Sequence, residues 1–138
     1  MSQIYDWSNS INNQELNNVV NIVKNGGIIV FPTETVYGIG ASALSKDSVE
    51  KIYQIKKRPN EKPLSILLYS KDQISKYANI TNSIEQKIIQ NFMPGPITLI
   101  LKRKDNSINY VASGKQTIGI RIPNNKIILS ILEKLDEP

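Results

Sequence analysis

The stretch that decides the fold is residues 27–40, which read GIIVFPTETVYGIG. Its first part, residues 27–31, is wholly apolar and predicts a central strand that is covered on both faces. Pro32 ends this strand, and the polar side chains that follow it are those of Thr33, Glu34, Thr35 and Tyr37. Because ligands bind beyond the carboxyl ends of strands in open α/β sheets, this segment is a candidate ligand-binding loop. The alternative is an ordinary loop, in which threonine and glutamate only satisfy backbone donors.

Helical and extended patterns alternate on either side of this stretch, which predicts the α/β class (mixed α+β). Helices are predicted at residues 13–24, 45–57, 71–77 and 83–92, and a last one begins after Asn124 as its N-cap. Strands are predicted at residues 64–69, 97–101 and 117–122, with a loop at 102–107. A length of 138 residues fits a single domain, spanning 1–138.

The composition narrows the chemistry that the chain can perform. There are no cysteines and no histidines, which excludes thiol nucleophiles, Ser-His-Asp triads and most zinc sites, and we expect no protein-held metal. The net charge of +5 favours anionic partners such as nucleotides or RNA, although the Ile, Asn and Lys bias of an AT-rich genome would give the same excess. The N-terminus lacks the layout of a signal peptide and no apolar run could span a membrane, so we expect a cytoplasmic protein.

Basic residues cluster where the second predicted helix ends. Lys56 continues the apolar spacing of that helix and is predicted to lie on its inward face, where it would either extend its ammonium group out to solvent or meet a buried anion. Arg58, just past the helix, can offer a bidentate fork to a phosphate or carboxylate. The alternative is a cationic helix end that only complements the helix dipole.

The strand at residues 117–122 places isoleucines on one face and Thr117, Gly119 and Arg121 on the other. Gly119 leaves space beside Arg121, as a ligand pocket would need. An edge strand with a solvated arginine explains the same pattern. Gly38 and Gly40 are expected to let the backbone turn and a ligand approach closely.

Four blocks of the chain occur in the order and spacing of the YrdC family of threonylcarbamoyl-AMP synthases, which the sequence resembles. They are FPTETVYGIG at 31–40, KKRPNEKPL at 56–64, MPGPITLIL at 93–101 and TIGIRIP at 117–123. The resemblance implies a single YrdC-like domain with a twisted mixed β-sheet flanked by helices.

The resemblance also implies a reaction and its partners. The family makes threonylcarbamoyl-AMP and pyrophosphate from L-threonine, bicarbonate and ATP, with a Mg²⁺ ion carried by the nucleotide. Partner proteins then transfer the threonylcarbamoyl group to tRNA, next to the anticodon, as the t6A modification. The runner-up is a non-catalytic module of the same fold that binds tRNA or other RNA on a basic concave face.

Residue roles follow from the same resemblance. Lys56 and Arg58 are the expected catalytic residues and would contact the nucleotide, as would Asn60 and Thr117. L-Threonine would be held by Thr33, Thr35, Tyr37 and Arg121. The family carries a further Ser-x-Ser-Ala-Asn motif after the block at 117–123 and its helix, so the domain is expected to be C-terminally incomplete at Pro138.

Overall fold

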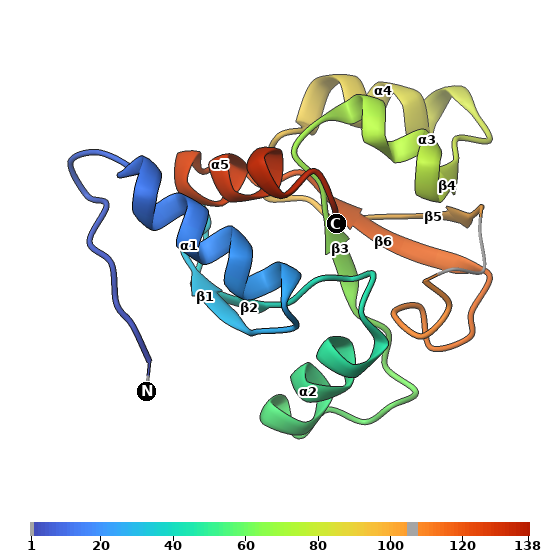
Figure 1. Ribbon diagram of the computed structural model, residues 1–138. Helices are drawn as coiled ribbons and strands as arrows, with labels where there is room; N and C mark the ends of the chain where they lie inside the picture. Colours follow the sequence, from blue (N-terminus) through green and yellow to red (C-terminus); the bar gives the residue numbers. More distant parts are fainter. Residues whose placement is uncertain (1, 105–107) are drawn as a thin grey trace.

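The computed structural model describes residues 2–104 and 108–138 (Figure 1). Its helices are α1 (Asn13–Lys24), α2 (Lys46–Lys56), the 3-10 turn η1 (Lys71–Gln73), α3 (Ile74–Tyr77), α4 (Ser83–Phe92) and α5 (Lys126–Leu135). Its strands are β1 (Ile29–Phe31), β2 (Gly38–Gly40), β3 (Ser65–Leu67), β4 (Ala78–Asn79), β5 (Leu99–Arg103) and β6 (Thr117–Arg121). The predicted α/β class, with a mixed sheet and flanking helices, is confirmed.

Within the described residues, the strands form a four-stranded sheet in the order β3-β6-β5-β4 and a separate hairpin of β1 and β2. β3 runs parallel to β6, and β5 runs antiparallel to both of its neighbours. The prediction of a central strand at 27–31 was wrong. Among the described residues β1 pairs with β2 alone, and Val30 is 68% exposed, because one face of the hairpin is left uncovered.

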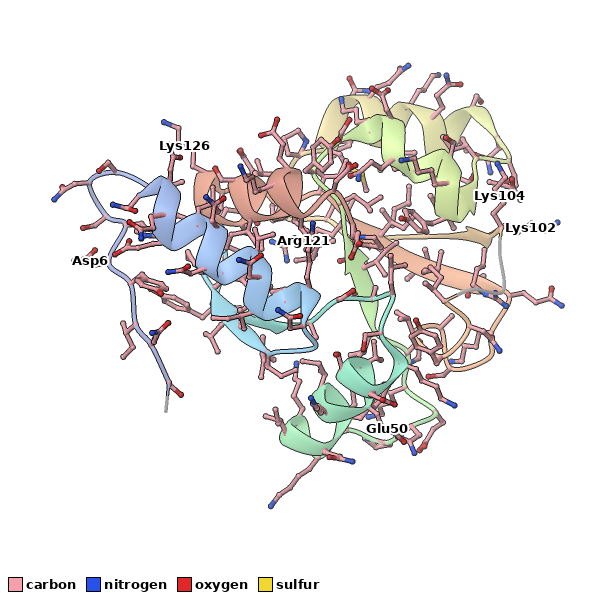
Figure 2. The ribbon with its side chains drawn as sticks, viewed as in Figure 1. Asp6, Glu50, Lys102, Lys104, Arg121 and Lys126 are labelled. Atoms are coloured by element: carbon pink, nitrogen blue, oxygen red, sulfur yellow. The ribbon has the colours of Figure 1, made fainter. Side chains whose placement is uncertain are left out.

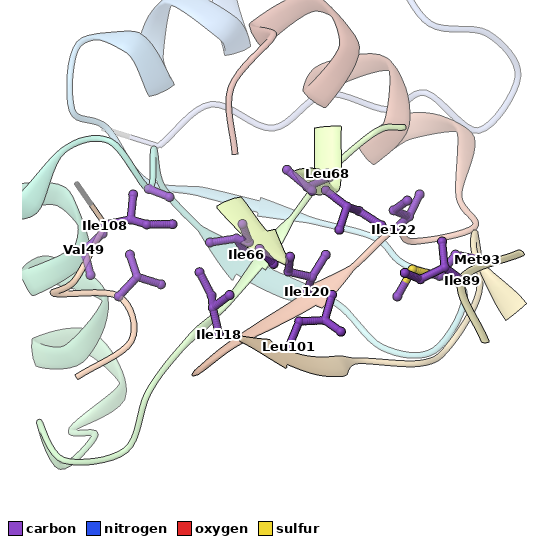
Figure 3. Close-up of a cluster of buried hydrophobic side chains, with 14 of the residues drawn as sticks. Val49, Ile66, Leu68, Ile89, Met93, Leu101, Ile108, Ile118, Ile120 and Ile122 are labelled. Atoms are coloured by element: carbon purple, nitrogen blue, oxygen red, sulfur yellow. The ribbon is translucent and has the colours of Figure 1, made fainter. Parts of the chain in front are cut away.

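Two apolar cores hold these elements together. The first packs against the four-stranded sheet and includes Ile118 and Ile120 of β6, Leu101 of β5 and Ile89 of α4 (Figure 3). The second joins α1, α5 and the hairpin, with Phe31 at its centre. Figure 1 shows α1 and α5 lying alongside each other above this hairpin, while α2 packs apart from them.

Local sequence signals account for most helix boundaries. In α1 the buried residues are Leu16, Val19, Val20 and Val23, the i, i+3, i+4, i+7 stripe of an amphipathic helix. Ser45 caps α2 as predicted. The cap of α5 was predicted one residue too early, because the Oδ1 atom of Asn125, and not Asn124, accepts the amide hydrogens of residues 127 and 128.

Other boundaries differ from the predictions. Residues 71–77 form a 3-10 turn followed by a single helical turn instead of one helix. Lys102 and Arg103, expected in a loop, extend β5 because they pair with Thr117 of β6 and with β4. Residues 105–107 of that predicted loop lie outside the described residues. None of the helices in the described parts of the chain is both long enough and apolar enough to cross a bilayer.

Candidate anion-binding site beside Arg121

The loop between the two hairpin strands is ordered by threonine hydroxyls. The Oγ1 atom of Thr33 donates to the carbonyl oxygen of Val36 at 2.5 Å and accepts from the amides of Thr35 and Val36, each at 3.2 Å. The hydroxyl oxygen of Thr35 lies 3.0 Å from that of Thr33, within hydrogen-bonding distance. The loop thus holds its own shape before any ligand binds.

Arg121 extends this network from the end of β6. Its Nη2 atom donates to Oγ1 of Thr35 at 3.3 Å and forms an ion pair with Oε1 of Glu34. The Arg121 and Glu34 side chains are 19% and 18% exposed. The interpretation of Arg121 as a solvated residue of an edge strand is wrong, since β6 lies between β3 and β5. Figure 2 shows Arg121 near the middle of the molecule, below α5.

Glu34 completes the link between the loop and the sheet. Its second oxygen, Oε2, accepts the backbone amide of Asn124, just before α5. Partial burial acts to raise the pKa of the Glu34 carboxyl, but the Asn124 amide and the Arg121 guanidinium outweigh this and hold the pKa below its ordinary value. Glu34 is therefore ionised near neutral pH, and the pair has no net charge.

A buried donor of Arg121 lacks an acceptor. Its Nε atom has no hydrogen-bond partner among the residues that the structure describes. Native structures rarely leave a buried donor without an acceptor, so an orphan on an arginine is a sign that an acceptor from outside the chain completes the site. A carboxylate or phosphate oxygen is the acceptor that a guanidinium binds most strongly.

The two predicted catalytic residues lie at the end of α2 and just after it. Lys56 is exposed, so the prediction of an inward lysine was wrong, because the buried stripe of α2 ends at Ile52 and Tyr53. The Arg58 guanidinium donates to two carbonyl oxygens of its own loop, that of Lys62 at 3.2 Å from Nε and that of Pro63 at 2.9 Å from Nη2. A ligand of Arg58 would have to share or replace these contacts.

Three further candidate residues, Thr117, Asn60 and Tyr37, form no hydrogen bond with Arg121 within the described part of the chain. Thr117 begins β6 and Arg121 ends it, so about 13 Å of extended strand separates them. Asn60 is exposed, and its carbonyl oxygen accepts the hydroxyl of Ser113 at 2.7 Å. Tyr37 is 75% exposed. The structure therefore brings together Thr33, Thr35 and Arg121 of the predicted threonine-binding set.

A mostly apolar cavity of about 130 Å³ lies between the hairpin, β3 and α5. Lys56 and Leu67 both border it, whereas Arg121 and Glu34 are not among its lining residues. Gly38 and Gly40 have a different role from the one predicted. A Cβ atom on Gly40 would lie 2.8 Å from the Phe31 ring, and one on Gly38 would lie 2.9 Å from it, so both glycines make room for Phe31.

The sequence placed Glu34 in the candidate loop but gave no sign of its role in this site. The charge of Glu34 in a loop of threonines was visible, but its partners lie 87 and 90 positions away in the chain. One of them is a backbone amide, which has no signature in the sequence. Within the described residues, no group of three or more acidic, histidine or cysteine side chains is placed to hold a metal ion.

An α/β domain in which a polar loop lies beside a buried arginine nitrogen without a partner among the described residues is a candidate for binding a small anion. Residues 21–138 match the Sua5, YciO and YrdC family model, described as telomere recombination, and the chain belongs to this family. A protein of Methanocaldococcus jannaschii is 45% identical over 122 residues, which are 86% of this chain and 58% of that protein. Threonylcarbamoyl-AMP synthase of Pyrococcus abyssi is 34% identical over 84% of this chain and 34% of its own.

The structure of P. abyssi Sua5 complexed with L-threonine has the same fold. The TM-score is 0.88 and the identity 31%, over 93% of this chain and 38% of that one. The chain thus spans between about a third and three fifths of the length of these relatives.

Proposed function

We propose that the chain is a threonylcarbamoyl-AMP synthase that binds L-threonine at the Arg121 network and condenses it with bicarbonate and ATP. The observation that carries this proposal is the buried, unpartnered Nε of Arg121 beside the Thr33–Thr35 loop. The relatives named above support the reaction, and the P. abyssi complex supports the amino acid.

The chemistry needs positioned anions and compensating charge. The amine of L-threonine and bicarbonate give a carbamate with loss of water. A carbamate oxygen then attacks the α-phosphorus of ATP, the bond to the bridging oxygen breaks, and pyrophosphate leaves. Negative charge builds on the phosphoryl oxygens, so cations and a nucleotide-borne Mg²⁺ are sufficient.

In this proposal one set of side chains binds L-threonine and a second set binds the nucleotide. The Thr33–Thr35 loop, Tyr37 and Arg121 hold L-threonine, with its carboxylate on Arg121. Lys56 and Arg58 neutralise the phosphates, with Arg58 sharing or releasing the carbonyl oxygens of its own loop. Asn60 and Thr117 contact the nucleotide, and the product passes to partner proteins that modify tRNA. A Ser-x-Ser-Ala-Asn segment, as in the family, would add to the nucleotide side of the site.

The first test is release of pyrophosphate from ATP by the 138-residue chain. We expect release that depends on both L-threonine and bicarbonate and that falls strongly in Arg121→Ala. In parallel, NMR titration reports the binding of L-threonine alone. If the chain binds neither L-threonine nor ATP, the proposal is wrong.

The same experiments separate the synthase from an RNA-binding module, which the net charge of +5 favours. Such a module would bind tRNA with an affinity that falls steeply with salt. Binding of tRNA without any binding of L-threonine would favour the module over the enzyme.

A further inference from the structure

Glu34 ties three segments of the chain together. Its Oε1 atom pairs with Nη2 of Arg121 at the end of β6, and its Oε2 atom accepts the amide of Asn124 before α5. Glu34 itself belongs to the loop between β1 and β2. Both carboxylate oxygens are therefore engaged with groups that lie about ninety positions further along the chain.

This arrangement fixes the orientation of the Arg121 guanidinium. A guanidinium is planar and rigid, so holding one nitrogen restricts where the others point. Glu34 and Thr35 both engage Nη2, whereas the buried Nε has no partner within the described residues. Nε and Nη2 lie next to each other in the guanidinium plane, so contacts at Nη2 fix the direction in which the Nε donor points.

We propose that Glu34 is a positioning residue, which holds Arg121 so that its Nε can receive the carboxylate of the amino-acid substrate. This inference rests on the proposed function, in which Arg121 binds that carboxylate.

The competing idea is that Glu34 occupies the place of the substrate carboxylate and must leave when the substrate binds. Two observations argue against it. Glu34 makes no contact with Nε, which is the unsatisfied donor, so two carboxylates can share the one guanidinium. Displacing Glu34 would also break its hydrogen bond to the Asn124 amide.

The test compares two ligands that differ only at the carboxylate. L-Threonine and L-threoninol, in which a hydroxymethyl group replaces the carboxylate, are titrated by NMR into the natural chain and into Glu34→Gln. We expect Glu34→Gln to weaken L-threonine binding about tenfold, the loss typical of one charge-assisted hydrogen bond, and to change L-threoninol binding by less than about twofold.

A double substitution shows whether Glu34 acts through Arg121. In the Arg121→Ala background, Glu34→Gln should cause no further loss of L-threonine affinity, because the group that it positions is gone. Glu50→Gln is the matched control, since it removes the same charge from the exposed side of α2, away from Arg121 (Figure 2). It should leave both affinities unchanged.

Several outcomes would overturn the inference. Tighter L-threonine binding in Glu34→Gln would show that Glu34 competes for Arg121. Unchanged binding, or an equal loss for both ligands, would show that Glu34 has no carboxylate-specific role. If Glu34→Gln does not fold, Glu34→Asp keeps the charge but is too short for both contacts, and it must show the same selective loss. Failure of the natural chain to bind L-threonine would reject the proposed function itself, and this is seen before any substitution is made.

Discussion

Replacing Glu34 by glutamine should destabilise the fold in a manner that depends on pH. The carboxylate accepts one hydrogen bond on each oxygen, from Arg121 and from the Asn124 amide. A glutamine side chain has a single acceptor oxygen, so one of these donors loses its partner. A hydrogen bond to a charged group contributes about 1.5–3 kcal/mol. Because the two side chains are 18% and 19% exposed, we expect a loss near the lower end, about 1–2 kcal/mol near neutral pH.

The direction of the pH effect follows from the lowered pKa of Glu34. The unfolded-state pKa of a glutamate is close to the ordinary value of 4.5, and the folded-state pKa lies below it. The ionised carboxylate therefore stabilises the fold fully above about pH 4.5, and this contribution is lost as the pH falls through the folded pKa. Glu34→Gln lacks the contribution at every pH, so the difference between the two proteins should narrow in acid.

Urea unfolding, followed by circular dichroism, measures this difference directly. Glu50→Gln is again the matched control and should stay within about 0.5 kcal/mol of the natural chain. A loss in Glu34→Gln no larger than that of the control, or a difference that widens as the pH falls, would refute the reasoning.

Three further predictions concern the surroundings of the site. Asn125→Ala should lower the free energy of unfolding by about 1 kcal/mol, because Asn125 caps α5. Asn124→Ala should lower it by less than about 0.5 kcal/mol, because Asn124 contributes its backbone amide and not its side chain. The urea midpoints of the two variants test this difference. Gly40→Ala should cost about 1–3 kcal/mol by crowding Phe31, and it should cost less in a Phe31→Leu background; equal costs in the two backgrounds would contradict this packing role. Thr35→Val should cost about 0.5–1.5 kcal/mol, because it breaks the hydroxyl chain from Arg121 to Thr33, and unchanged thermal unfolding would show that the chain contributes nothing.

The parts of the fold that the sequence predicted well are those in which local signals agree. The bounds of α1 and α4 were predicted correctly. In the structure Asn12 and Asn82 cap their first turns, and the buried residues of α1 follow helical spacing up to the Asn25-Gly26 breaker. The hairpin was not predicted. An apolar run of five residues does not show whether one face or two are covered, and Gly38-Ile39-Gly40 lacks the side chains typical of a strand.

The site was predicted in part, for a related reason. Alternation along β6 placed Arg121 on the face opposite the buried isoleucines, and the polar loop after β1 was recognised as a candidate. The connection between them depends on Glu34, whose partners are remote in sequence and include a backbone amide. Lys56 was misplaced because helical spacing continues to the last residue of α2, but the packing that would bury it ends one turn earlier.

The most direct test of the proposed function is the origin of the atoms in its product. The 138-residue chain is incubated with ATP, L-threonine and bicarbonate labelled with heavy carbon, and the nucleotide products are analysed by mass spectrometry. We predict an AMP conjugate that contains the threonine residue and the labelled carbon, and that is absent without L-threonine and strongly reduced in Arg121→Ala. Pyrophosphate release without such a conjugate, or a conjugate formed equally well by Arg121→Ala, would contradict the account.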